Sequence, residues 1–168
     1  SKGRCASTST VPRLLPDGTP DPSFGESGVS AAVPLSIEHI AVDPKGRILV
    51  AGSAIYRPCG KNGSSHELAV ARLGANGGLD SGFGNEGVVL VRTEGEREEI
   101  SAGGLAIRED GTILVLGNGG NRPTGSLMAF TVNGALDPSF GDGGIVESDG
   151  VSRVLLALPG GRAVIASV

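Results

Sequence analysis

Apolar residues along the chain come in short runs, and each run ends at a turn signal. The longest runs, such as "ILVAG" (48–52) and "VLLAL" (154–158), have strand-like length, and no dozen-residue window keeps a 3.6-residue period without Gly or Pro. β-rich runs flank Gly46, Gly111 and Gly161, as expected for hairpins. The pattern predicts an all-β fold.

One loop motif occurs three times at nearly constant spacing. Its copies are "PDPSFGESG" (20–28), "LDSGFGNEG" (79–87) and "LDPSFGDGG" (136–144). Phe24, Phe83 and Phe140 hold the same place in the motif, each followed by Gly and preceded three residues earlier by Asp. Internal repetition therefore governs the fold prediction.

Each repeat contains the signals for four strands. One strand precedes an Asp-Gly or Asn-Gly turn, one follows the Phe-Gly loop, and two flank the later Gly turn. The predicted repeat units cover residues 9–53, 66–118 and 126–168, within a single repeat domain spanning 1–168.

At these residues the chain resembles the delta-60 repeat, a bacterial tandem repeat of β-propeller type with the signature "ARLNADGSLDTSFG" followed by "ALQPDGKILVAG". The segments "ARLGANGGLDSGFGNEG" (71–87) and "LAIREDGTILVLG" (105–117) match it closely, whereas "PGGRAVIAS" (159–167) departs from it. The resemblance implies a β-propeller and an extracellular or cell-envelope location in a bacterium. It brings no catalytic, cofactor-binding or metal-binding residues.

Three four-stranded blades do not complete a propeller, because such rings have 4 to 8 blades and each blade needs a neighbour on its apolar face. We expect either half of a six-bladed ring, completed by a homodimer, or a fragment of a longer propeller with further repeats in the parent protein. The alternative is a closed three-fold β-trefoil or β-prism, in which one chain suffices.

Composition excludes two classes of partner. The net charge is −4, the 14 basic residues are scattered, and there is no Trp and one Tyr, which predicts no nucleic-acid binding. No apolar run approaches the ~20 residues that a bilayer span requires, which predicts no membrane insertion. Aromatic residues make up only 3% of the chain, so small aliphatic side chains must fill the core.

The Phe-Gly loops invite two interpretations. We interpret Phe24, Phe83 and Phe140 as packing anchors, because the same residue in every repeat favours structure over ligand stacking. Asp21, Asp80 and Asp137 lie in the loops and raise the question of calcium, but none fits an EF-hand pattern. We expect Asx-type turns there, and we predict no metal and no cofactor.

Histidine and cysteine add little chemistry. His39 and His66 form no pair with zinc-ligand spacing, and we interpret both as ordinary polar residues. Cys5 and Cys59 occupy corresponding places before the first strands of adjacent units. A disulfide between them and two free thiols both remain open.

The leading functional prediction is a non-enzymatic repeat module of an exported or cell-surface protein that binds a protein or glycan, or serves as a structural scaffold. The alternative is a hydrolase or lyase type of enzyme with Glu94, Glu96 or Glu98 in an acidic site at the ring centre. Insertions near 54–67 and 92–100 are either binding surface or solvated charged loops. Exposed end strands also raise the prospect of self-assembly.

Overall fold

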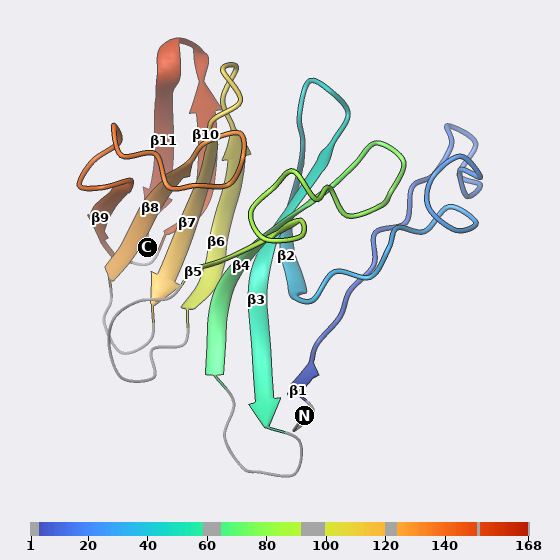
Figure 1. The fold of residues 1–168 in the computed structure, drawn as a ribbon. Coiled ribbons are helices and arrows are strands. Elements are labelled where there is room, and N and C mark those ends of the chain that lie inside the picture. The colour runs from blue at the N-terminus through green and yellow to red at the C-terminus, as the bar shows by residue number, and fades with distance from the viewer. Residues whose placement is uncertain (1–3, 59–64, 92–99, 120–123, 151, 168) are drawn as a thin grey trace.

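The computed structural model of the chain describes residues 4–58, 65–91, 100–119, 124–150 and 152–167 (Figure 1). These residues form an all-β structure, as predicted. The strands are β1 (Arg4–Ala6), β2 (Ser36–Val42), β3 (Ile48–Pro58), β4 (Ser65–Leu73), β5 (Val88–Val91), β6 (Ile100–Ile107), β7 (Ile113–Gly119), β8 (Thr124–Phe130), β9 (Ile145–Asp149), β10 (Ser152–Leu158) and β11 (Arg162–Ser167), with a 3-10 turn η1 (Pro159–Gly161) between the last two.

The strands form three antiparallel sheets. The first sheet is the four-stranded meander β2-β3-β4-β5, with the short β1 paired to the far end of β3. The second is the four-stranded meander β6-β7-β8-β9, and the third is the hairpin β10-β11. Four-stranded antiparallel sheets are therefore confirmed for two of the three sheets, and the third is a two-stranded hairpin.

The sheets and the sequence repeats are offset by two strands. The first sheet joins the last hairpin of the first repeat, β2-β3, to the first two strands of the second repeat, β4-β5. The second sheet joins β6-β7 of the second repeat to β8-β9 of the third in the same way. Backbone hydrogen bonds thus tie each repeat to the next.

This offset leaves half a sheet at each end of the chain. The first two predicted strands, before and after the first Phe-Gly loop, meet through isolated bridges at Ser9–Val33 and Pro12–Val29. At the other end, β10 and β11 are the last hairpin of the third repeat, and they form a sheet of two strands.

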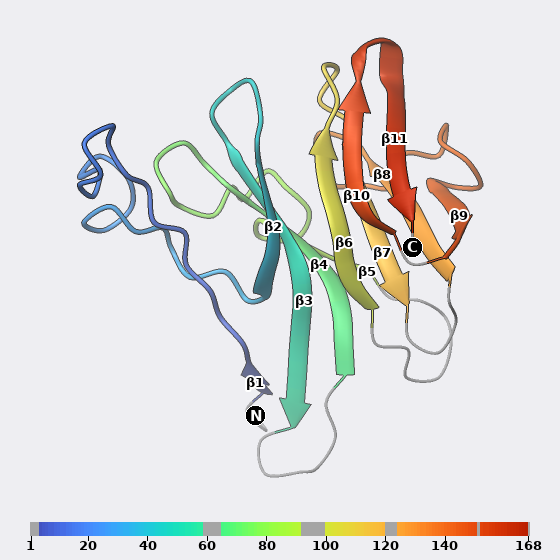
Figure 2. The ribbon, with the colours of Figure 1, turned by 180° about the vertical axis from the view of Figure 1, so that it is seen from behind.

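The sheets stack in chain order, and β2, β6 and β10 lie next to one another (Figure 2). The core between the first and second sheets contains Leu49, Ala51, Leu68, Val70, Phe83, Ala102, Ile113, Val115, Met128 and Phe130. The core between the second sheet and the last hairpin contains Ala106, Leu114, Leu116, Leu127, Ala129 and Leu155. Layers stacked in series differ from the closed three-fold trefoil or prism of the alternative prediction.

The first sheet is covered on its other face by the N-terminal half sheet. Apolar side chains of that segment pack against apolar side chains of the first sheet. The segment contributes Val11, Phe24, Val33 and Leu35, and the sheet contributes Val50, Ala69, Ala71 and Leu73. Part of the predicted insertion at 54–67 belongs to the sheet, because β3 continues through Pro58 and β4 begins at Ser65. Within the described residues, no helix is long and apolar enough to cross a membrane.

Candidate functional site: a cleft between three bulged strands

The neighbouring strands β2, β6 and β10 each carry a β-bulge at the same level. The register shifts between Ile37 and His39, between Ala102 and Gly104, and between Ser152 and Val154, which leaves one extra residue in each strand. The extra residues are Glu38, Gly103 and Arg153. A bulge re-aims a side chain away from the regular alternation of a strand. At this equivalent position the first repeat has a carboxylate, the second has a glycine without a side chain, and the third has a guanidinium.

Glu38 connects the first sheet to the second. Its Oε2 accepts a hydrogen bond of 2.8 Å from the backbone N–H of Ala102 on β6, and its Oε1 accepts one of 2.5 Å from the Ser53 hydroxyl on β3. The carboxylate is thereby held by donors from two sheets. Such charge-assisted bonds fix its position between β2 and β6.

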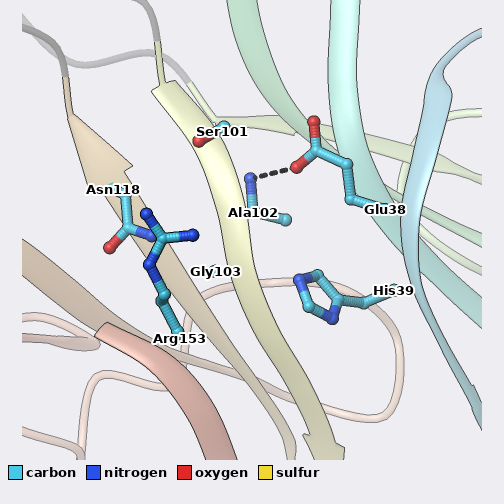
Figure 3. Close-up of a pocket in the computed structure, with 7 residues that line it drawn as sticks. All are labelled: Glu38, His39, Ser101, Ala102, Gly103, Asn118 and Arg153. Carbon is cyan, nitrogen blue, oxygen red and sulfur yellow. Dashed lines mark hydrogen bonds between the residues drawn. The ribbon is translucent and has the colours of Figure 1, made fainter. Parts of the chain in front are cut away.

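The bulges border an open cleft of about 360 Å³. Its lining residues are Glu38, His39, Ser101, Ala102, Gly103, Asn118 and Arg153. Figure 3 shows Glu38 and His39 on one side, Asn118 and Arg153 on the other, and β6 between them. Gly103, on β6 between the two sides, has no side chain to fill the middle of the cleft.

The cleft contains polar groups that the protein itself leaves uncommitted. Neither the His39 side chain nor the Arg153 side chain makes a hydrogen bond or an ion pair with any residue that the structure describes. Glu38 is the one described carboxylate in the lining, and both its oxygens already accept hydrogen bonds. The cleft is therefore equipped to bind an anionic or hydroxyl-rich ligand, and it lacks a second lining carboxylate among the described residues for paired acid and base chemistry.

The first Phe-Gly loop is a clasp between repeats. Arg13 stacks on the Phe24 ring with its guanidinium carbon 4.4 Å from the ring centroid, and its Nε donates to Asp21 Oδ2 at 2.8 Å. The same guanidinium donates to the backbone oxygen of Ala75 in the next repeat at 2.7 Å. The N–H of Gly25 donates to the backbone oxygen of Asn76 at 2.7 Å. We call this set of contacts the loop clasp.

The second repeat makes the same clasp. Arg72 lies 4.7 Å from the Phe83 centroid, donates to Asp80 at 2.8 Å, and donates to the backbone oxygen of Val132 in the third repeat. The N–H of Gly84 donates to the backbone oxygen of Asn133 at 2.9 Å. Each of these two loops thus binds the Asn-Gly turn of the following repeat.

Close approach explains the Gly after each Phe. Gly25 and Gly84 have φ of 56° and 54°, in the left-handed region that disfavours a side chain. A Cβ on Gly25 would overlap the backbone oxygen of Val29, and one on Gly84 would meet that of Val88. Phe24 and Phe83 are fully buried, so their interpretation as packing anchors is confirmed.

The loop aspartates act inside the clasp. Asp21, Asp80 and Asp137 each accept a hydrogen bond from the backbone N–H two residues later, which is the expected Asx-type turn. Hydrogen bonds from the Ser23 hydroxyl and N–H hold the pKa of Asp21 below its usual value. For Asp80, burial raises the pKa, but the Gly82 N–H and the Arg72 charge outweigh it, so the pKa is lowered. Among the described residues, no three His, Cys, Asp or Glu side chains are grouped to hold a metal ion.

Several predicted candidates lie elsewhere or outside the described residues. Glu94, Glu96, Glu98 and Cys59 are among the residues not described. His66 lies on β4, opposite Ile55 of β3. The cysteine pairing therefore stays a prediction, with Cys5 on β1 opposite Arg57 of β3.

Sequence reasoning missed the arginines of the clasp and the residues of the cleft. Arg13 and Arg72 each precede their aspartate by eight residues, and this shared spacing was a usable signal. His39 was interpreted as an ordinary polar residue, whereas it lines the cleft with Arg153. No sequence pattern marks a bulge at Glu38 or Arg153, so the cleft had no comparable signal.

Comparison with known proteins gives one finding. A family model described as a β-propeller domain of unknown function (DUF5122) matches residues 7–24 and 44–83. Together with the stacked four-stranded sheets, this description confirms the predicted fold class. The match does not carry the delta-60 name, and that finer resemblance stays a prediction. Searches of curated proteins and of solved structures find no match to the chain.

Proposed function

We propose that the chain is a non-enzymatic binding module of β-propeller type in an exported or cell-surface bacterial protein, and that the cleft binds a carboxylate-bearing sugar of an acidic glycan. The observation that carries this proposal is the pair of uncommitted groups, His39 and Arg153, that face one cleft. A guanidinium is the preferred side chain for planar recognition of a carboxylate.

The remaining lining suits the rest of a sugar. Ser101 offers a hydroxyl, and Asn118 contributes an amide from β7. Glu38 retains acceptor capacity beyond its two hydrogen bonds, since a carboxylate accepts about four. A cleft of about 360 Å³ is at the small end of the range for ligand sites, which favours one terminal sugar over an extended chain.

The support for a binding role over catalysis comes from Glu38. Its carboxylate accepts hydrogen bonds from Ala102 and Ser53, so its position serves the junction of two sheets. General acid and base catalysis of glycoside cleavage commonly uses two carboxyl groups at a defined separation. The lining described here offers one such group.

A titration of oligosaccharides that end in a uronic acid, against their neutral counterparts, tests the proposal. We expect heat of binding for the acidic series alone, and a roughly tenfold or greater loss of affinity in Arg153→Gln, because one charge-assisted contact disappears. Lys45→Gln is the matched control, since it removes the same charge from an exposed turn away from the cleft. Equal binding of neutral and acidic sugars, or unchanged affinity in Arg153→Gln, would overturn the proposal. Turnover of the bound sugar would favour the enzyme alternative.

A further inference from the structure

The two half sheets at the ends of the chain correspond to the two halves of a complete sheet. The β10-β11 hairpin occupies the place of β2-β3 and β6-β7, each of which is extended by an outer strand, β4 or β8. The N-terminal segment 9–33 occupies the place of the outer pairs β4-β5 and β8-β9. Each end therefore lacks the half that the other end supplies.

The exposed edges of these halves match in register. Leu73 pairs with Ile48 in the first sheet, and Phe130 pairs with Ile113 in the second. By the repeat spacing, Leu14 corresponds to Leu73 and Phe130, and Ala163 corresponds to Ile48 and Ile113. The backbone groups of Ser9, Val11 and Arg13 bond to residues 28–33. Because backbone groups alternate along a strand, those of Thr10 and Leu14 are directed to the opposite, open edge.

One apolar face of β11 is exposed, whereas the corresponding strand face in the second sheet is buried. Val164 is 47% exposed, whereas Leu114, at the same place in the second sheet, is 0% exposed. Val154, Leu156 and Leu158 of β10 are exposed on the same face. The β10-β11 hairpin thus exposes an apolar surface that, in the two preceding sheets, is covered by the next repeat.

The opposite end exposes the matching surface. Leu14 is 59% exposed, whereas Leu73 in the second repeat is 0% exposed. On β2, Ile40 and Val42 are 54% and 63% exposed, although their counterparts Leu105 and Ile107 pack against the core between the two sheets. A hairpin equivalent to β10-β11 would cover Ile40 and Val42, as β3 covers Leu105 and Ile107, and would lie beside Leu14 in the same sheet, as β3 lies beside Leu73.

The loop clasp is also interrupted at both ends. Phe24 and Phe83 each lie against the Gly of the following Asn-Gly turn, Gly77 and Gly134. Phe140 in the third repeat has no following turn among the described residues and is only half-buried. The first turn, at Gly18, has nothing within 4 Å of a Cβ position, so it lacks the covering loop that Gly77 and Gly134 have.

We infer that two copies of this chain associate head to tail, each adding β11 to segment 9–14 of the other and placing its Phe140 loop over the other's Gly18 turn. Each copy has two complete sheets and two halves, so two such junctions yield six sheets. Six lies within the 4 to 8 blades of closed propellers. A closed head-to-tail pair leaves neither apolar end exposed.

Pro12 lies in the segment that would pair with β11 of the second copy. It holds the place of Ala71, which pairs with Val50 in the first sheet, but proline supplies no N–H to a ladder. Under the inference, Pro12→Ala restores a donor at each of two junctions. We expect about fivefold or greater tightening of the dimer, from two ordinary hydrogen bonds. A free edge would give no change in association.

Light scattering and sedimentation over a range of concentrations provide the measurement. We expect a limiting mass of twice the 16.7 kDa of the chain, and a roughly hundredfold or greater weakening in Val164→Glu, because a charge would enter the dry interface. Leu90→Glu on β5 is the control, since Leu90 is exposed and lies away from both ends. A monomer at all concentrations, growth into open polymers, or equal effects of the two glutamates would overturn the inference.

Discussion

The second and third Phe-Gly loops share a motif but differ in their surroundings. Phe83 is fully buried beneath Arg72 and the Gly134 turn of the following repeat. Phe140 is half-buried. Ala129 stands where the second repeat has Arg72, and the guanidinium near the Phe140 ring is that of Arg108, with its carbon 5.4 Å from the ring centroid. Burial of this phenylalanine therefore depends on the next repeat as well as on its own loop.

The comparison also separates two roles of the loop. Within a repeat, the Asx-type turns of Asp80 and Asp137 are alike, and so are the positive φ values of Gly84 and Gly141. Between repeats, the second loop bonds to Val132 and Asn133 of the following repeat, whereas the third loop makes no equivalent bond among the described residues. Local geometry is therefore encoded by the motif, and the contact across repeats is added by the neighbour.

Phe83→Ala should destabilise the protein more than Phe140→Ala. Loss of a buried phenylalanine costs about 3–5 kcal/mol of unfolding free energy, whereas a half-buried ring loses about 1–2 kcal/mol. Urea unfolding of both variants in dilute solution, where chains are separate, measures the difference. Equal losses would show that the following repeat contributes nothing to the packing of Phe83.

The destabilisation caused by Phe140→Ala, unlike that caused by Phe83→Ala, should depend on protein concentration. If the Phe140 loop covers the Gly18 turn of a second copy, the cost of Phe140→Ala rises with protein concentration, because the associated state buries more of the ring. The cost of Phe83→Ala stays constant, because its covering turn belongs to the same chain. Unfolding midpoints across a hundredfold dilution series distinguish these outcomes.

A smaller effect is expected for Arg72→Met compared with Arg108→Met. Methionine keeps an apolar stem over the ring but removes the bonds to Asp80 and to the Val132 carbonyl. Because the Arg72 side chain is buried, unpaired partners should cost about 1.5–3 kcal/mol. Arg108 makes no such bond to the next repeat among the described residues, and we expect about 0.5 kcal/mol. A destabilisation of equal size in both variants, measured by thermal unfolding, would contradict a bridging role for Arg72.

The repeat architecture was predictable because its signals are local. Turn residues such as Asp17 and Gly18, the alternating runs and the Phe-Gly motif each fix a short backbone geometry. Their spacing predicted most of the strands and a four-stranded unit. Which strands share a sheet was not predictable, because a periodic sequence does not reveal where one sheet ends, and the pairing crosses the repeat boundaries.

The candidate cleft was not predictable for a different reason. It depends on bulges at Glu38, Gly103 and Arg153, which re-aim side chains from three strands far apart in sequence. A bulge reflects the balance between local backbone and pairing across strands, and only the Gly at 103 gives a weak local signal. His39 lines the cleft from the first repeat, whereas Arg153 comes from the third.

The smallest expected effect is the acid sensitivity of the clasp, compared between Asp80→Asn and Asp137→Asn. The pKa of Asp80 is lowered, since the Gly82 N–H and the Arg72 charge outweigh burial, and that of Asp137 is lowered by hydrogen bonds from Ser139. A lowered folded pKa adds stability above the unfolded value of about 3.9, and this stability is lost as the pH falls through the folded pKa. Each Asn variant should therefore lose less stability than the wild type between about pH 5 and 2.

The two variants should differ in their dependence on salt. Arg72 donates to Asp80, whereas the principal partner of Asp137 is the hydroxyl and N–H of its own Ser139. Salt weakens a partly buried charge pair such as Arg72–Asp80 less than an exposed one, and it leaves a neutral hydrogen bond nearly unchanged. The stability lost in Asp80→Asn at pH 7 should shrink in 1 M salt, and that lost in Asp137→Asn should not. Urea midpoints at two pH values and two salt concentrations measure this, and an equal response to salt would remove the electrostatic part of the contrast between the two loops.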